Sequence, residues 1–568
     1  MSNAVIIHNL KDYEVLKNIF DDSVFYSSNF YHYICLKDKG VKYLYGEPSL
    51  SSNHYHEISQ ACMSWFRDEN EIDIIQNHGI SIGPIIARRV ITSFANDYRN
   101  YLSLLKLSEE YKSILISKKS EISFLNVKKI FKDKVKFFES INPTSSFTSS
   151  PDRTKISYFP FVHKLSLFAR FLQIPFKILI KSKVLVWSDW SYSEEMQKRK
   201  DVLYLNSLIP WKGFYLKKNK KYTSYNSDSE FEKIFPKKLI NNFFNRVDLE
   251  KRLIKMNIKW DSELIILFKQ TIIRSYENNY LKFKNCYFIF KELFSYYSPK
   301  AIIFPGGTHF AYLLAIQLAK KIEIKTILAL DGYPVLSDKN IFHKDISGKK
   351  HIFDKYIAYS SAANDLYNKF DKIEKDQLLI SRSPLVEKLE KSKVKFNNSI
   401  EILVLAYYPN LHNPNSRWDK RFEIVSSIIQ LLSKKGFKNI TIKVKRGEDE
   451  DNEIKLYKTY LKKINSQSNI KIVSGDLYNI LSRFQFAIGQ ISTACYESAI
   501  VDIPYFVYEP YDSGLSELDL KKSCIANFNS VPRNLNELDN SLVNNNAIVF
   551  KKRNYISDGL HLSKIKLM

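Results

Sequence analysis

The residues with the clearest chemical potential lie between Ile472 and Pro510, in the stretch IVSGDLYNILSRFQFAIGQISTACYESAIVDIPYFVYEP. Gly489 ends an expected strand there, and Ser492 and Thr493 follow where the next helix begins. The free backbone N–H groups of a helix start, with small hydroxyls beside them, can bind an anion such as a nucleotide phosphate. Glu497 comes one turn later, where its carboxylate could accept hydrogen bonds from ribose hydroxyls. The spacing predicts a nucleotide site, although a capped helix without any ligand would use the same residue types.

An alternation of strands and helices must position these residues. From Lys300 onward, apolar stretches typical of strands, such as AIIF, KTILAL and EILVLAYYPN, alternate with stretches of helical periodicity, such as AYLLAIQLAKKI. This alternation is typical of parallel sheets flanked by helices, in which ligands bind at the carboxyl ends of the strands. A polar stretch at 391–399 separates two such units, so the sequence predicts two Rossmann-like domains that face a central cleft.

The N-terminal half shows the same alternation less regularly. NAVIIHN, SVFYSS and KYLYG have the composition of short strands, and residues 231–297 have the composition of helices. A long helix is expected after NHG, because apolar residues recur there at the spacing of one helix face. These residues are Ile82, Ile85, Ile86, Val90 and Phe94.

The segment FQFAIGQISTACYESAIVDIPYFVY resembles the donor-binding domain of GT-B glycosyltransferases that build bacterial surface polysaccharides. In particular it resembles the capsule-type transferases that use CMP-Kdo or CMP-sialic-acid-like donors. Gln485 stands where that family often has Asp, and Asp502 where it often has Gly. The resemblance covers roughly residues 300–515, and it implies that Ser492 and Thr493 bind the donor phosphate while Glu497 lies near the ribose.

The general base is a second expectation from this resemblance. An inverting glycosyl transfer needs a base that takes the proton from the acceptor hydroxyl. The turn DGYP at 331–334 is similar to the Glu-Asp-Gly turn that ends a strand of the acceptor domain in capsule transferases. Asp331 is therefore the candidate base, with His309 of PGGTHF and His343 of IFHKD as substitutes. A turn or a surface histidine without a catalytic role remains the alternative.

The basic residues of the expected donor site depart from the family. Related enzymes often carry Lys-x-His-Pro after the second strand of the donor domain, whereas this chain has IKVKRGEDE. Lys443, Lys445 and Arg446 could still stabilise a departing phosphate through their charge. Arg417, in YYPNLHNPNSRW, is a further candidate phosphate contact or a solvated side chain. The missing histidine leaves the nucleotide of the donor open.

Charge and cysteine content bear on the partners and the compartment. The chain has 568 residues and a formal net charge of +26, which permits contact with an anionic surface but also agrees with a composition rich in Lys, Ile and Asn. Its five cysteines are dispersed without a CxxC pair, which favours reduced thiols in a cytosol. The stretch 158–184 is basic and amphipathic, so it could hold the protein on the inner face of the cytoplasmic membrane or pack as an ordinary helix.

Together these observations predict a cytoplasmic, inverting glycosyltransferase that uses neither a metal nor another cofactor. It would transfer a sugar from a nucleotide-activated donor, with CMP as one candidate nucleotide, to a glycan or lipid-linked glycan of a bacterial surface. We expect an α/β, GT-B-like fold: an acceptor-side domain (1–395) with a helical insertion at about 155–300, a donor domain (396–540), and a tail (541–568) that packs back on the first domain. A CDP-polyol phosphotransferase of the teichoic-acid type is one alternative. A nucleic-acid-binding or scaffold protein is the other, although no nucleic acid is expected.

Overall fold

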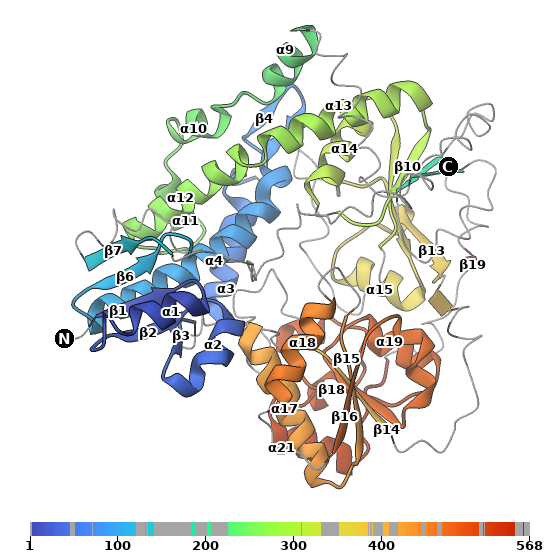
Figure 1. Cartoon of the computed structure of the whole chain (residues 1–568). Helices are drawn as coiled ribbons and strands as arrows, with labels where there is room; N and C mark the ends of the chain where they lie inside the picture. The colour runs from blue at the N-terminus through green and yellow to red at the C-terminus, as the bar shows by residue number, and fades with distance from the viewer. Residues whose placement is uncertain are drawn as a thin grey trace, which may run out of the picture.

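The computed structural model contains three parallel sheets within the residues that it describes, and they follow one another along the chain (Figure 1). The described residues are 3–45, 52–70, 72–120, 131, 134–140, 184–187, 202–205, 225–307, 309–330, 351–383, 385–386, 389, 401–407, 418–445, 450–462, 468–510, 515, 517–550 and 560–561.

The first sheet lies at the left of Figure 1 and has the strand order β3-β2-β1-β6-β7, with every pair parallel. Its strands are β1 (Ala4–Ile7), β2 (Val24–Ser27), β3 (Lys42–Tyr43), β6 (Ile114–Ser117) and β7 (Val135–Phe138). The helices between them include α1 (Leu10–Leu16), α2 (Phe30–Leu36), the 3-10 turn η1 (Lys37–Lys39) and α3 (Ser52–Ser64). This strand order is that of a Rossmann fold, with its switch point between β1 and β6. The sequence predicts one domain for residues 1–395. In the structure this range contains the first sheet and also the strands β8 (Val184–Trp187) to β13 (Leu378–Arg382) of a second sheet.

A layer of helices runs from the first sheet to the second (Figure 1). The antiparallel pair β4 (Gln76–Asn77) and β5 (Ile80–Ser81) leads into the long helix α4 (Ile82–Glu110). The five apolar positions predicted for one face of this helix are all fully buried, which confirms that prediction. The other helices of the layer are α9 (Tyr225–Ile234), α10 (Leu239–Phe244), α11 (Leu249–Lys255), α12 (Ser262–Glu277) and α13 (Tyr280–Tyr297).

The second sheet has the order β19-β13-β12-β11-β10-β8-β9, and all its pairs are parallel. Its strands are β8 (Val184–Trp187), β9 (Val202–Leu205), β10 (Ala301–Phe304), β11 (Lys325–Leu328), β12 (Lys355–Ala358), β13 (Leu378–Arg382) and the tail strand β19 (Leu560–His561). The intervening elements include α14 (Phe310–Lys321), α15 (Ser361–Lys369) and the turn η4 (Lys375–Gln377). Apart from the tail strand, this is a flavodoxin-like order with its switch point between β8 and β10.

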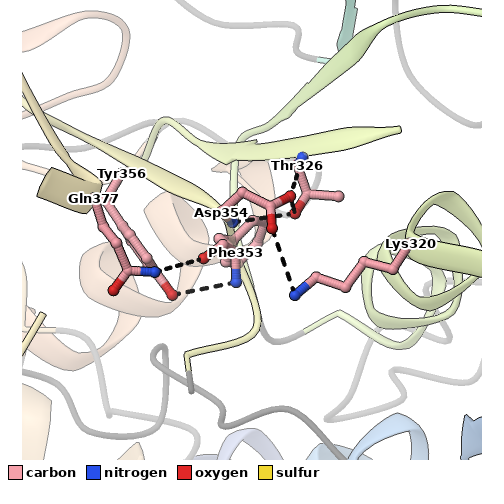
Figure 2. A network of polar contacts seen from close by, with 6 residues as sticks. All are labelled: Lys320, Thr326, Phe353, Asp354, Tyr356 and Gln377. Carbon is pink, nitrogen blue, oxygen red and sulfur yellow. Dashed lines mark hydrogen bonds and ion pairs between the residues drawn. The ribbon is translucent and has the colours of Figure 1, made fainter. Parts of the chain in front are cut away.

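A polar network joins β11 to β12 at their amino ends (Figure 2). The carboxylate of Asp354 accepts hydrogen bonds from the backbone N–H of Thr326 at 2.7 Å and from its hydroxyl at 2.8 Å. The ammonium group of Lys320 lies 3.8 Å from the same carboxylate. The network stabilises the pairing of β11 with β12. It lies at the edge opposite the carboxyl ends of the strands, where ligands of parallel sheets bind.

The third sheet, at the bottom of Figure 1, has the order β16-β15-β14-β17-β18 with all pairs parallel. Its strands are β14 (Glu401–Leu405), β15 (Asn439–Lys443), β16 (Asn469–Val473), β17 (Phe486–Gly489) and β18 (Tyr505–Val507). The connecting elements include α17 (Trp418–Lys434), α18 (Glu450–Leu461), η5 (Leu477–Asn479), η6 (Leu481–Arg483) and α19 (Thr493–Ile500). The switch point of this Rossmann order lies between β14 and β17. The predicted α/β, GT-B-like class, with two Rossmann-like units in series, is confirmed by the second and third sheets.

Two further contacts tie the units together. Phe30 of α2 stacks on Phe422 of α17, with ring centroids 5.3 Å apart, so the first unit packs on the third. Beyond β18 the chain forms α20 (Glu517–Lys521), η8 (Phe528–Ser530) and α21 (Leu535–Val543), and β19 then pairs with β13. Among the described helices, none combines the length and apolar composition needed to cross a membrane. The stretch 158–184 lies outside the described residues.

Candidate functional site

The predicted nucleotide site lies at the carboxyl edge of the third sheet, beside the switch point between β14 and β17. Gly489 is the last residue of β17, and a Cβ atom placed on it would lie 2.9 Å from Cβ of Leu405 and 2.5 Å from the hydroxyl oxygen of Tyr505. The Tyr505 hydroxyl donates to the carbonyl of Gln490 at 2.7 Å. Glycine is therefore required for close approach, and the turn after β17 is held tightly against β14 and β18.

The start of α19 is capped by residues of the chain itself. Ser492 is the N-cap, and its hydroxyl accepts a hydrogen bond from the N–H of Ala494 at 3.3 Å. The N–H of Ser492 contacts the sulfur of Cys495 at 3.4 Å, and the N–H of Cys495 donates to the carbonyl of Ser492 at 3.0 Å. The side chain of Ser492 thus has the capping role that needs no ligand, and a phosphate would have to compete with weak internal contacts. Thr493 is half-buried at the first position of the helix.

Glu509 braces the same turn and was missed by the sequence reasoning. It is fully buried just after β18, and its carboxylate accepts a hydrogen bond from the N–H of Ile491 at 2.7 Å. The only signal in the sequence is a carboxylate that directly follows the apolar run YFVY. A buried carboxylate needs hydrogen-bond donors, so this position of Glu509 could have been predicted to have a specific donor in the fold.

Glu497 carries a buried polar atom that no described residue satisfies. Its Oε2 atom is buried and has no hydrogen-bond partner among the described residues. Burial raises the pKa of this carboxyl to about 7, with the nearby Lys443 ammonium lowering it and the Asp476 carboxylate raising it. A carboxylate with a buried acceptor atom left open is suited to a ligand that donates hydrogen bonds, such as a ribose diol.

The basic residues predicted for this site differ in their environments. Lys443, at the end of β15, is only 7% exposed, and its ammonium donates to the carbonyl of Val444 at 2.6 Å. Lys445 is exposed. Arg446 and Arg417 lie outside the described residues. Among the predicted basic residues that the structure describes, Lys443 is the one whose charge acts on the carboxyl group of Glu497.

The candidate bases belong to the second sheet or to undescribed segments. His309 lies between β10 and α14, at the carboxyl edge beside the switch point, and forms the N-cap of α14. Its Nδ1 atom accepts a hydrogen bond from the N–H of Ala311 at 3.4 Å, so a neutral ring carries its proton on Nε2. That arrangement makes the outer nitrogen a donor and weakens the case for His309 as a base. Asp331 and His343 lie outside the described residues.

Comparison with known proteins finds no matching family model and no matching curated protein. Among solved structures, the chain is similar to a UDP-GlcNAc 2-epimerase of Methanocaldococcus jannaschii in complex with UDP-GlcNAc and UDP. That match has 11% identity and a TM-score of 0.35 over 66% of this chain and 94% of the other. It is similar to S. aureus MnaA with UDP at 9% identity and a TM-score of 0.35, over 64% of this chain and 87% of the other. It is also similar to a glycosyltransferase of Rickettsia africae at 15% identity and a TM-score of 0.25, over 46% of this chain and 69% of the other. At these values the likenesses assign no activity.

Proposed function

We propose that the chain is a GT-B-type glycosyltransferase that binds a nucleotide-sugar at the carboxyl edge of the third sheet. The observation that supports this most is the open, buried Oε2 atom of Glu497, which lies near Lys443 and one turn into the helix after the switch-point strand. A ribose offers two hydroxyl donors to such an acceptor. The position agrees with the general rule that ligands of open α/β sheets bind at the switch point.

In this proposal the chain's own residues bind the nucleotide and activate the acceptor. Glu497 would hold the ribose, and the start of α19 at Ser492 and Thr493 would face the phosphate. The positive charge of Lys443 would offset negative charge that develops as the nucleotide leaves. Asp331 would take the proton of the acceptor hydroxyl, which gives inversion in one displacement without a metal.

The acceptor and donor remain proposals from the sequence resemblance. We propose a bacterial surface glycan, free or lipid-linked, as the acceptor, and a CMP-linked sugar as one donor to test first. Attachment to the inner membrane surface through 158–184 belongs to the same proposal.

The test is a nucleotide screen followed by product analysis. CMP, CDP, UDP and GDP are added separately to the wild-type protein and to Glu497→Gln, and the melting temperature is measured. A ligand that binds the native state raises the melting temperature, by an amount that grows with its concentration over Kd. One nucleotide should stabilise the wild type and lose most of this effect in the variant.

The matching nucleotide-sugars are then incubated with saccharide acceptors. A new glycosidic bond supports the proposal, whereas an isomerised donor with no transfer contradicts it. Release of CMP from CDP-glycerol with transfer of glycerol phosphate would identify the polyol phosphotransferase instead. If no nucleotide stabilises the wild type, the donor site is placed wrongly.

A further inference from the structure

The carboxyl edge of the first sheet holds a second cluster of polar residues, far along the chain from the site above. His8 and Asn9 directly follow the central strand β1, and Ser140 follows β7. Asp12, which is fully buried, accepts hydrogen bonds from the N–H of His8 at 3.0 Å and from the hydroxyl of Ser140 at 3.0 Å. The side-chain amide of Asn9 donates to the Ser140 hydroxyl at 3.0 Å. These bonds fix the loop after β1 at the switch point of a Rossmann order.

His32 lies next to this loop, on α2, which follows the neighbouring strand β2. Its side chain is only 8% exposed, and its Nδ1 atom is buried without a hydrogen-bond partner among the described residues. Burial, more than any other cause, lowers the pKa of His32 to about 4; the His8 ring lowers it further, while a hydrogen bond with the His8 backbone and the Asp12 carboxylate raise it. The imidazole is therefore neutral at physiological pH.

The hydrogen-bond pattern also sets the tautomer of His32. Since Nδ1 has no partner, the bond with the His8 backbone belongs to Nε2, which donates its proton to the carbonyl oxygen. Nδ1 then carries a lone pair and can only accept. An acceptor left open in a buried position is costly, so a ligand that donates a hydrogen bond there would bind favourably.

We propose that the carboxyl edge of the first sheet, at β1 and β2, binds an uncharged saccharide, one of whose hydroxyl groups donates to Nδ1 of His32. The cluster does not suit a phosphate. An ionised phosphate oxygen cannot donate to a lone pair, the buried Asp12 carboxylate would repel it, and the loop HNLKD has no glycine that would let backbone N–H groups close around an anion. The inference does not depend on the donor site, because it rests on residues of a different sheet.

The same helix connects this cluster to the third sheet. Phe30, two residues before His32, stacks on Phe422, and Ile34 packs into the apolar core around α17 and α18. A saccharide on the first sheet would therefore be held by a unit that packs directly on the third sheet.

The experiment uses full-length protein labelled with ¹⁵N-histidine and follows the Nδ1 resonance of His32, assigned by its loss in His32→Leu. The probes are the methyl glycosides of glucose, galactose and N-acetylglucosamine, with uridine and inorganic phosphate as separate arms. At least one glycoside should move the Nδ1 resonance saturably, because an accepted hydrogen bond changes the shielding of that nitrogen. Its Kd should weaken at least tenfold in His32→Leu.

The controls separate this site from the rest of the molecule. His78→Ala, at an exposed histidine of the β4–β5 turn, should bind the glycoside as the wild type does, and so should Glu497→Gln. Binding lost in Glu497→Gln but kept in His32→Leu would place the sugar at the third sheet and overturn the inference. So would a response to phosphate or uridine alone, or no response of Nδ1 to any glycoside. If His32→Leu does not fold, the Nδ1 resonance is assigned by its loss in His32→Gln instead, and the titration of the wild type then decides the matter.

Discussion

Replacing Glu497 by Gln removes a titrating group while keeping the shape of the side chain, and its effect can be worked out from the burial of that carboxyl. Its pKa is raised from 4.5 to about 7, so the native state keeps a proton that the unfolded state has already released between these pH values. Stability therefore falls as the pH rises from 4.5 through 7, and the full cost of the buried charge is present above pH 7. At about 1.4 kcal/mol per tenfold change in proton affinity, this cost is at most about 3–4 kcal/mol.

The nucleotide-free variant should accordingly be more stable than the wild type at pH 8, by up to that amount, and nearly equal to it at pH 4.5. The measurement is the difference in melting temperature between the two proteins at both pH values, in low-salt buffer without ligand. For a chain of this size a gain near the upper limit corresponds to several degrees. Adding the nucleotide found in the screen should reverse the order at pH 8, because the wild type then gains ribose hydrogen bonds that the variant makes less well.

Glu453→Gln is the matched control, since Glu453 is also a buried carboxylate of the third unit. It is 7% exposed, and it accepts a hydrogen bond from the guanidinium of Arg421 at 3.3 Å. Removing this carboxylate takes away the negative charge paired with a buried cation, so the control should be destabilised at pH 8, by about 3 kcal/mol. If Glu497→Gln is destabilised like the control, the carboxylate has an internal structural partner. In that case the reasoning from its open acceptor atom is wrong.

Three further changes test other parts of the proposal. Asp331→Asn should lower turnover about a hundredfold or more with little change in donor affinity, because it removes basicity and preserves shape; unchanged turnover in a coupled nucleotide-release assay would move the base elsewhere. Gly489→Ala should lower the melting temperature and cost about 1–3 kcal/mol, since the new methyl group meets Leu405 and Tyr505, while Gly306→Ala, whose Cβ has nothing closer than 3.9 Å, should be tolerated. Replacing both Lys177 and Lys181 by Glu should abolish salt-sensitive flotation with anionic vesicles, at about 1 kcal/mol lost per basic residue; equal flotation of wild type and variant would leave 158–184 without a membrane role.

Local patterns were sufficient for several elements of the second and third sheets. Short apolar runs with helical stretches between them predict parallel strands and crossover helices, and the runs at β10, β14 and β17 form strands as expected. The stretch LYNILSRF has the composition of a short helix, but it forms the two 3-10 turns η5 and η6. Its apolar residues do not continue at a spacing of 3.6 residues long enough to stabilise an α-helix without tertiary support.

The division of the N-terminal half into two sheets was harder to predict from the sequence, because it depends on pairing between strands that are far apart in the chain. The strands β1 and β6 are neighbours, although more than 100 residues separate Ala4 from its partner Ile114. A short apolar strand does not specify which other strand it will pair with, since most parallel pairs differ little in local composition. The sequence therefore indicated strands near the N-terminus but not that they close a separate sheet with its own switch point.

The same physical reason applies to the residues predicted for the donor site. Gly489, Ser492 and Glu497 lie close together in the sequence, so their spacing alone predicts the helix start that follows β17. Whether a polar atom of this segment has a hydrogen-bond partner depends on distant side chains. The N–H of Ile491 donates to the carboxylate of Glu509, whereas Oε2 of Glu497 has no partner among the described residues. His32 depends even more on the assembled fold. Nothing in the sequence FYHYICL distinguishes it from a surface histidine, and it is buried only because β1 and the loop after it pack beside it. Buried acceptors without a partner are thus a property of the assembled fold, and no local motif predicts them.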